Sequence, residues 1–330
     1  MTLPAVTIIS LGGTISSTDT GSGGVAPSLS GEDLVEEVPE IAKVAEVSAT
    51  SLRQVPGSEL NLGDLIELAG QIQVHIDAGT RGVVVTQGTD TIEGTAFVLD
   101  LLVHADAPIV VTGAMRHPSL PGAEGPANLL ASVQVAVSDA ARGVGTVVVL
   151  NDEIHAARFV QKTHTQNLAT FRSPLTGPVG WVSEGTPRIA TRPVGRYHVP
   201  LPEETQDRPI ALYTVGLGDD GRLLEAVGQL GYEGLVIEAL GGGHVLSHMA
   251  DPLETLAGEM PVVLASRTGS GEVLRNTYGF TGSETDLLSR GLISAGMLDG
   301  PKARLLLSLL LRAGASEEEA TAAFGYFLGG

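Results

Sequence analysis

The sequence predicts an α/β protein with parallel sheets, divided into two domains. Short runs rich in valine, leucine and isoleucine recur along the chain, and segments with helical periodicity lie between them. The runs are apolar throughout rather than alternating, which is typical of strands buried on both faces. Strands that alternate with helices form βαβ units, and hence parallel sheets. Because the 330 residues exceed the roughly 250–300 at which a single core stops growing, we expect two domains.

The predicted elements follow one another in a regular order. The predicted strands are Val6–Ser10, Val47–Leu52, Gly82–Thr86, Ile109–Thr112, Thr146–Leu150, Ala211–Val215, Leu235–Glu238 and Val262–Ala265. The predicted helices are Leu60–Asp77, Ile92–His104, Ala127–Ala141, Gly221–Leu230 and Pro301–Arg312. From Glu184 to Arg208 the periodicity fades and prolines accumulate. We therefore expect a flavodoxin- or Rossmann-like parallel-sheet domain over residues 1–190, a linker over 191–208 and a smaller C-terminal α/β domain over 209–330.

The composition excludes several classes of protein. A formal net charge of −19 would repel a phosphate backbone, so we expect no nucleic-acid partner. The chain has no cysteine, which excludes disulfides and thiolate metal sites. Its apolar runs are shorter than the roughly 20 residues of a membrane-spanning helix, and its first residues lack the pattern of a signal peptide. We therefore expect a cytoplasmic protein that has no membrane partner.

Polar side chains follow the predicted strands of the first domain. They are Thr14 after the first strand, Ser58 and Glu59 after the second, Thr89 and Asp90 after the third, and Lys162 beyond the fifth. Ligands of open parallel sheets bind outside the carboxyl ends of the strands, so these side chains should converge on one crevice. The sequence has neither a Gly-x-Gly-x-x-Gly nor a Walker pattern, so no nucleotide cofactor is expected.

This set of side chains suits the hydrolysis of an amide. Such a reaction needs a nucleophile, a base that activates it and donors for the oxyanion, and a desolvated lysine can be the base for a hydroxyl. Each residue also has a simpler interpretation. Thr14 could cap a turn, Asp90 with Glu93 could form a capping box, and Lys162 could be a solvated surface lysine. Their predicted convergence favours a common site.

Segments throughout the chain resemble the bacterial-type asparaginase/glutaminase family. The two family signatures match Ile9–Ile15 and, more fully, Val84–Glu93. Further matches are Val110–Arg116, Lys162–Thr165 continuing through Ala169–Phe171, Ser266–Gly271 and Gly300–Arg304. Both signatures occur in order and at the expected spacing, so the resemblance covers essentially the whole chain. It implies an L-asparaginase that needs no cofactor and no metal.

The resemblance implies roles for the residues that match the signatures. Thr14 would attack the amide carbon and form a β-aspartyl ester, while Thr89, Asp90 and Lys162 would form a hydrogen-bonded relay with Lys162 as its base. The order in which the two threonines attack stays open. Backbone N–H groups of Thr14 and Thr89 would meet the oxyanion.

The resemblance also implies how the substrate is held. Ser58, within the Gly57–Glu59 turn, would bind the α-carboxylate of the substrate. Asp90 and Glu59 would bind its α-ammonium. Gly88 would lie beside the substrate, and the carbonyl of Ala114 would accept a hydrogen bond from its amide.

The family borrows residues from a neighbouring subunit, so the resemblance implies a homo-oligomer, expected as a dimer of dimers. Glu284 falls where a family carboxylate contacts the substrate ammonium, and His244 falls where many members carry asparagine. Simpler interpretations are an exposed loop acid for Glu284 and an ordinary histidine for His244. The resemblance makes both residues candidates for substrate binding.

The sequence departs from the family pattern at three places. The segment Ser16–Pro27, expected to be a flexible lid, contains no tyrosine, although the family usually has one there. Another tyrosine, Thr20 or a water molecule could substitute for it. Glu59 replaces a common glutamine, so we expect minor glutaminase activity. Glu124 replaces a common aspartate in a loop expected to shape the site.

Three other functions compete with this prediction. An asparaginase-like amidotransferase subunit would carry an additional N-terminal domain, whereas the first predicted strand begins near residue 5. A non-catalytic sensor of aspartate or asparagine is favoured by the missing tyrosine, but it has no evident use for Lys162 as a buried base. A metal-dependent hydrolase could use His244 and His248, yet this pair lacks the glutamate of a His-Glu-x-x-His motif.

Overall fold

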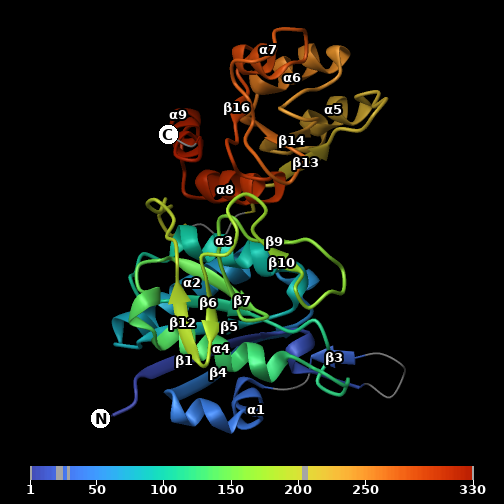
Figure 1. Cartoon of the computed structure of the whole chain (residues 1–330). Helices are drawn as coiled ribbons and strands as arrows, with labels where there is room; N and C mark the ends of the chain where they lie inside the picture. Colours follow the sequence, from blue (N-terminus) through green and yellow to red (C-terminus); the bar gives the residue numbers. More distant parts are fainter. Residues whose placement is uncertain (1, 20–24, 28–29, 203–206, 329–330) are drawn as a thin grey trace. The chain divides into compact units, whose positions relative to one another are not determined.

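The computed structural model describes residues 2–19, 25–27, 30–202 and 207–328. The chain forms two compact units, Met1–His198 and Val199–Gly330, and each has its own parallel sheet (Figure 1). The mixed α/β class and the smaller second domain expected from the sequence are therefore present.

The sheet of the first unit is mostly parallel. Its order in the described part of the chain is β12-β11-β8-β7-β6-β5-β1-β4. The parallel strands are β1 (Ala5–Gly12), β4 (Glu46–Val55), β5 (Gly82–Thr86), β6 (Ile109–Thr112) and β7 (Thr146–Leu150). The antiparallel strands β8 (Glu153–Ala156), β11 (Gly180–Ser183) and β12 (Thr186–Ile189) extend one edge. The sequence patterns missed these three strands because polar residues interrupt them, whereas β6, which is also four residues long, is a continuous apolar run.

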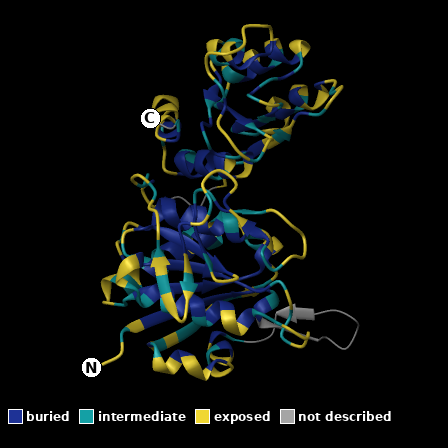
Figure 2. Ribbon diagram, in the orientation of Figure 1, coloured by how far each residue is buried: buried dark blue, intermediate teal, exposed yellow. Residues whose placement is uncertain are grey.

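Helices cover both faces of this sheet, as continuous apolar strands require. The helices are α1 (Gly31–Glu36), α2 (Leu62–Asp77), α3 (Ile92–Leu102) and α4 (Gly125–Val137). Leu34 of α1 and Leu129 of α4 share one core cluster with Ile8 and Val84 of the sheet. Helices α2 and α3 pack together against the opposite face, and the central strands β1, β5, β6 and β7 are almost entirely buried (Figure 2).

Arg196 fixes the C-terminal end of α3. Its guanidinium lies 3.0 Å from the carboxylate of Asp100 and donates to the backbone carbonyls of Val103 and Ala105 at 3.1 and 2.9 Å. Asp100 also accepts a hydrogen bond from the backbone N–H of Thr146, the first residue of β7, at 2.9 Å. Residues 191–198, expected to lie in the linker, therefore belong to the first unit.

The second unit contains a parallel sheet in the order β13-β14-β15-β16. Its strands are β13 (Ile210–Thr214), β14 (Gly234–Ala239), β15 (Val262–Ser266) and β16 (Ile293–Ser294). Its helices are α5 (Arg222–Val227), α6 (Ala250–Ala257), α7 (Glu284–Ser289), α8 (Gly300–Arg312) and α9 (Glu317–Gly325). Helices α5, α6 and α7 share one core cluster with the sheet, and α8 packs on β13 and β14. Among the described residues, none of the helices is long and apolar enough to span a membrane.

We predict that Arg196→Ala destabilises the first unit by about 3 kcal/mol, because it leaves Asp100 as a largely buried carboxylate without its ion pair. Urea unfolding followed by tryptophan fluorescence would measure this, since Trp181 lies on β11 of the same unit. The control is Arg188→Ala, which removes an exposed arginine on β12. Equal unfolding midpoints for the two variants would contradict the prediction.

Candidate active site

Three loops meet backbone to backbone at the carboxyl edge of the first sheet. A Cβ added to Gly13, whose φ is +88°, would lie 2.0 Å from the backbone nitrogen of Gly88. A Cβ added to Gly57 would lie 2.9 Å from the carbonyl oxygen of Gly88. Only glycine permits this approach, which joins the loops after β1, β4 and β5. Thr14 and Thr89 directly follow two of these glycines in the sequence, so both main chains leave from this contact.

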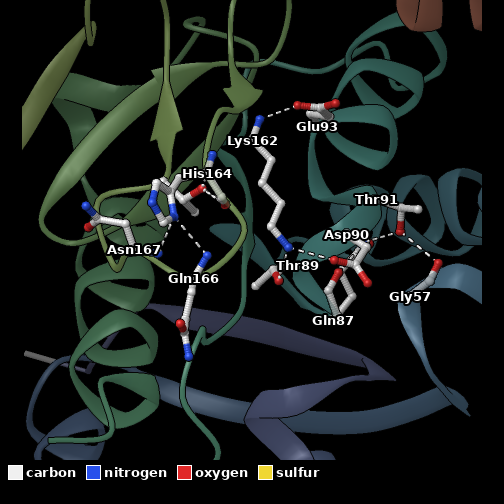
Figure 3. A network of polar contacts seen from close by, with 12 residues as sticks. Gly57, Gln87, Thr89, Asp90, Thr91, Glu93, Lys162, His164, Gln166 and Asn167 are labelled. Atoms are coloured by element: carbon white, nitrogen blue, oxygen red, sulfur yellow. Dashed lines mark hydrogen bonds and ion pairs between the residues drawn. The ribbon is translucent and has the colours of Figure 1, made fainter.

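Side-chain hydrogen bonds close the contact between two of these loops. Thr91 donates from its hydroxyl to the carbonyl oxygen of Gly57 at 2.9 Å (Figure 3). Gln87 donates from Nε2 to Thr91 Oγ1 at 3.0 Å and to the carbonyl oxygen of Gly88 at 3.2 Å. Gln87 is completely buried, so these bonds stabilise the contact in an interior of low dielectric.

Lys162 reaches the same point from another part of the fold. It lies on the ribbon of β9 (Gln161–Lys162) and β10 (Phe171–Arg172), and its Nζ donates to Thr89 Oγ1 at 2.9 Å. The same Nζ forms an ion pair with Asp90 Oδ1 at 2.6 Å (Figure 3). The Lys162 side chain is 15% exposed and the Asp90 side chain 71%, so the carboxylate remains open to a ligand while it binds the lysine.

The backbone of Lys162 is also fixed. Its N–H donates to the carboxylate of Glu93, one turn along from Asp90 (Figure 3). One short segment around the start of α3 thus supplies the hydroxyl and carboxylate that meet the ammonium of Lys162, and the carboxylate that holds its main chain. Thr89, Asp90 and Lys162 therefore form a connected network, to which we refer as the relay.

Ala114 lies on the loop after β6, close to the same residues. A Cβ added to the preceding Gly113 would lie 3.4 Å from Thr89 Cγ2, and one added to Gly125 would meet both Ile15 and Ala114. Ala114 is therefore packed close to the residue that comes after Thr14. Glu124 accepts hydrogen bonds from the backbone N–H groups of Met115 and Arg116, so its carboxylate shapes this loop.

His244 and Glu284 lie in the second unit, and the structure brings them together. His244 Nε2 is 3.2 Å from Glu284 Oε2, and the other carboxylate oxygen accepts backbone N–H groups of Thr277 and Tyr278 at 2.9 and 2.8 Å. The carboxylate of Glu284 is completely buried. Burial acts to raise its pKa, but the N–H groups of Tyr278 and Thr277, aided by the charge of His244, outweigh this and hold the pKa below its ordinary value.

The aromatic rings around His244 are partly exposed. Tyr278 and Phe280 pack edge-on against the imidazole, with ring centroids at 4.8 and 5.2 Å. His248, which the sequence had suggested as a partner of His244 in a metal pair, instead lies 3.1 Å from the carbonyl oxygen of Asp219.

The structure thus groups the candidates of each unit separately. The predicted residues of the first unit are Thr14, Gly57, Ser58, Glu59, Gly88, Thr89, Asp90, Ala114 and Lys162. Of the expected lid Ser16–Pro27, residues 20–24 lie outside the described part of the chain. The sequence analysis did not identify the roles of Gln87 and Thr91, whose hydrogen bonds hold the loops together, or of Glu93, which accepts the backbone N–H of Lys162. All three residues lie within the second family signature, which was the signal available in the sequence.

Comparisons with known proteins match both units. The family model for the asparaginase N-terminal domain matches residues 5–195, and that for the glutaminase/asparaginase C-terminal domain matches residues 210–324. An L-asparaginase of Bacillus licheniformis is 35% identical, covering 93% of this chain and 95% of its own. A probable L-asparaginase of Deinococcus radiodurans is 37% identical, covering 96% of each. The crystal structure of a probable cytoplasmic L-asparaginase from Campylobacter jejuni has a TM-score of 0.89 at 29% identity, covering 97% of this chain and 99% of its own.

We predict that Gly13→Ala destabilises the first unit more than Gly79→Ala does. Both glycines have positive φ, +88° and +97°, so each substitution carries a strain of roughly 1–2 kcal/mol. A Cβ at Gly79 meets nothing within 4 Å, whereas one at Gly13 collides with the backbone of Gly88 and adds about 1–3 kcal/mol of overpacking. Equilibrium unfolding of the two variants measures the difference. Equal losses of stability would show that the loops can separate freely.

Proposed function

The chain belongs to the asparaginase family and is an L-asparaginase, and we propose that it acts through an ester on Thr14. The observation that carries this proposal is the contact of Lys162 with both Thr89 and Asp90. A lysine held largely out of solvent against a hydroxyl suits proton transfer rather than surface solvation. The close approach of Gly13 to Gly88 supports a role for Thr14, the residue that follows Gly13, as the second hydroxyl of the site.

The reaction that we assign to the site has two stages. Thr14 Oγ1 attacks the side-chain amide carbon, and its proton passes to the leaving nitrogen, which departs as ammonia. A β-aspartyl ester on Thr14 remains. A water molecule then attacks the ester carbon, its proton returns to Thr14, and aspartate is released. Lys162, as the neutral amine, is the base of the relay, and Thr89 orients the attacking water. Once Lys162 has taken up a proton, Asp90 stabilises its ammonium form by the 2.6 Å ion pair.

The substrate is held by groups around the relay. We propose that Ser58, in the turn that starts at Gly57, binds the α-carboxylate, and that Asp90 and Glu59 bind the α-ammonium. The exposure of the Asp90 carboxylate supports this second contact. Backbone N–H groups of Thr14 and Thr89 meet the oxyanion, because they are preorganised where negative charge develops.

In this arrangement, the backbone carbonyl of Ala114 accepts a hydrogen bond from the substrate amide. Gly88 leaves room for the substrate because it has no side chain. Glu59 has a carboxylate where many family members have the amide of a glutamine. We therefore propose that the enzyme also hydrolyses glutamine, more slowly than asparagine.

We further propose that the enzyme is a homo-oligomer, a dimer of dimers, in which Glu284 contacts the substrate ammonium bound by a neighbouring subunit and His244 contributes to the same binding site. The buried carboxylate of Glu284 is kept ionised by backbone N–H groups, which supports a charge-recognition role. We place the enzyme in the cytoplasm, as described for the Campylobacter jejuni protein. A Haemophilus influenzae relative is described as periplasmic, so cell fractionation is the test.

We predict that Thr14→Ala and Lys162→Met each lower ammonia release from L-asparagine by at least about 10³-fold, because each removes a group that acts on the reacting bonds. L-Aspartate should still bind to both variants, which calorimetry would measure. Lys43→Met, at an exposed lysine, is the control and should keep wild-type activity. The same assay with L-glutamine should give a slower rate.

A different outcome would favour the alternative function. If the folded wild-type protein releases no ammonia from millimolar L-asparagine and yet binds L-aspartate, the chain is a sensor, and the ester mechanism is wrong. If Lys162→Met keeps its activity, the enzyme uses another base.

We predict that Thr14→Ala and Glu284→Gln, each inactive alone, regain activity when the two variants assemble into a mixed oligomer. Thr14→Ala retains Glu284, and Glu284→Gln retains Thr14, so a mixed dimer contains one complete site. Denaturing the two proteins together and refolding them in equal amounts should recover about a quarter of the wild-type activity, by random pairing of subunits across a two-fold interface. The same two variants refolded separately and then mixed without exchange are the control. Activity that stays absent in the mixed oligomer would show that the sites are not shared.

A further inference from the structure

A row of polar side chains, two of them buried and one partly exposed, lies next to the ribbon that carries Lys162. Ser173 Oγ is 3.0 Å from His155 Nδ1, and His155 Nε2 is 3.3 Å from Glu153 Oε2. His155 is 1% exposed and Ser173 is 5% exposed. A substrate cannot reach this serine and histidine, so the row is not a second hydrolytic triad. Its place in the fold indicates a different use.

The row connects the Lys162 ribbon to the main sheet. Glu153 and His155 belong to β8, which pairs with β7 and β11 of that sheet. Ser173 directly follows β10, whose first residue, Phe171, is paired with Lys162. Arg172 of β10 adds a weaker contact, with its Nη1 3.6 Å from Glu153 Oε2. The strand opposite Lys162 is therefore fastened to β8 by side chains at two successive positions.

Lys162 is thus held from two sides. Glu93 on α3 accepts its backbone N–H, and the partner strand of its ribbon is bound to β8 through Ser173 and His155. Nζ of Lys162 lies 2.9 Å from Thr89 and 2.6 Å from Asp90. Because the lysine side chain has several rotatable bonds, a fixed main chain is needed to limit the positions that Nζ can take and to keep it within reach of both groups.

We propose that His155, together with Glu153 and Ser173, is a positioning residue that fixes the Lys162 ribbon at the distance from α3 which catalysis requires. This inference rests on the proposed role of Lys162 as the base. Neutral imidazole suits the task, because the tautomer with hydrogen on Nε2 donates to Glu153 while Nδ1 accepts from the hydroxyl of Ser173.

The charge state of His155 depends on its surroundings. Burial lowers the pKa of His155, the carboxylate of Glu153 acts to raise it, and the guanidinium of Arg172 lowers it; these two are the charged groups that face the ring. The ring therefore stays neutral at neutral pH. The unfolded chain takes up this proton near pH 6.5, so the contribution of His155 to stability is complete above that pH and is lost as the pH falls below it.

The test compares three variants of the full-length enzyme. His155→Leu removes both hydrogen bonds, Ser173→Ala removes only the hydroxyl, and His155→Asn keeps an acceptor near the position of Nδ1. We expect kcat for L-asparagine to fall by up to about 10²-fold in His155→Leu, because a shift of about 1 Å in a catalytic group costs that much. Ser173→Ala should lose less, and His155→Asn should recover most of the rate. KM should change little, since none of these residues touches the substrate.

The control is His198→Asn, at another histidine of the first unit whose pKa is lowered by burial, and it should keep the wild-type kcat. Thermal unfolding at pH 7 and pH 5 supplies a second readout. His155→Asn should lose less stability than the wild type over this interval, because asparagine does not titrate. The small Ser173→Ala change provides the rate comparison should His155→Leu fail to fold.

Two results would overturn the inference. One is a kcat within threefold of wild type in both His155→Leu and Ser173→Ala. The other is a loss of kcat in proportion to a loss of folded protein, with no recovery in His155→Asn. The proposed function is tested separately by Lys162→Met: if that variant is inactive while the His155 variants are normal, only the positioning role fails.

Discussion

Gly13, Gly57 and Gly88 bring three loops of the first unit into backbone contact, and every proposed contact with the substrate there depends on this steric constraint. Without side chains at these points, the ends of β1, β4 and β5 approach closely enough to share one ligand. The hydrogen bonds of Gln87 and Thr91 then keep the loops from separating. Thr14 and Thr89 become neighbours because the main chains before them touch, and no contact between their own side chains is needed.

The relay contains a positive charge within a protein whose net charge is strongly negative. The chain carries 38 acidic and 19 basic residues, and Lys162 is its one lysine within the relay. Asp90 is placed both to neutralise this lysine and to face a ligand, because its carboxylate remains largely exposed. In the proposed mechanism, the α-ammonium of the substrate adds positive charge beside the carboxylates, which favours its binding. The ion pair would thus link substrate recognition to the position of the proposed base.

In the second unit, the fold stabilises a buried charge, the carboxylate of Glu284. This carboxylate is shielded from water, and two backbone N–H groups and His244 stabilise its ionised form. These donors are held in place by the fold, so the proposed binding of a substrate ammonium by Glu284 would require no reorganisation of them. The edge-on rings of Tyr278 and Phe280 hold the imidazole in the orientation that meets the carboxylate.

The amino-acid sequence alone was enough to predict the α/β class, the longer strands and the convergence of Thr89, Asp90 and Lys162, because buried parallel strands are continuous apolar runs and bring the residues after them to one edge. The antiparallel edge strands β8, β11 and β12 were not predicted because polar residues interrupt them, so none of them is a continuous apolar run. Only the tertiary structure paired His155 with Ser173, Glu93 with Lys162, and Arg196 with α3. Each of these bonds joins residues far apart in the chain through single side chains, so no local pattern encodes it.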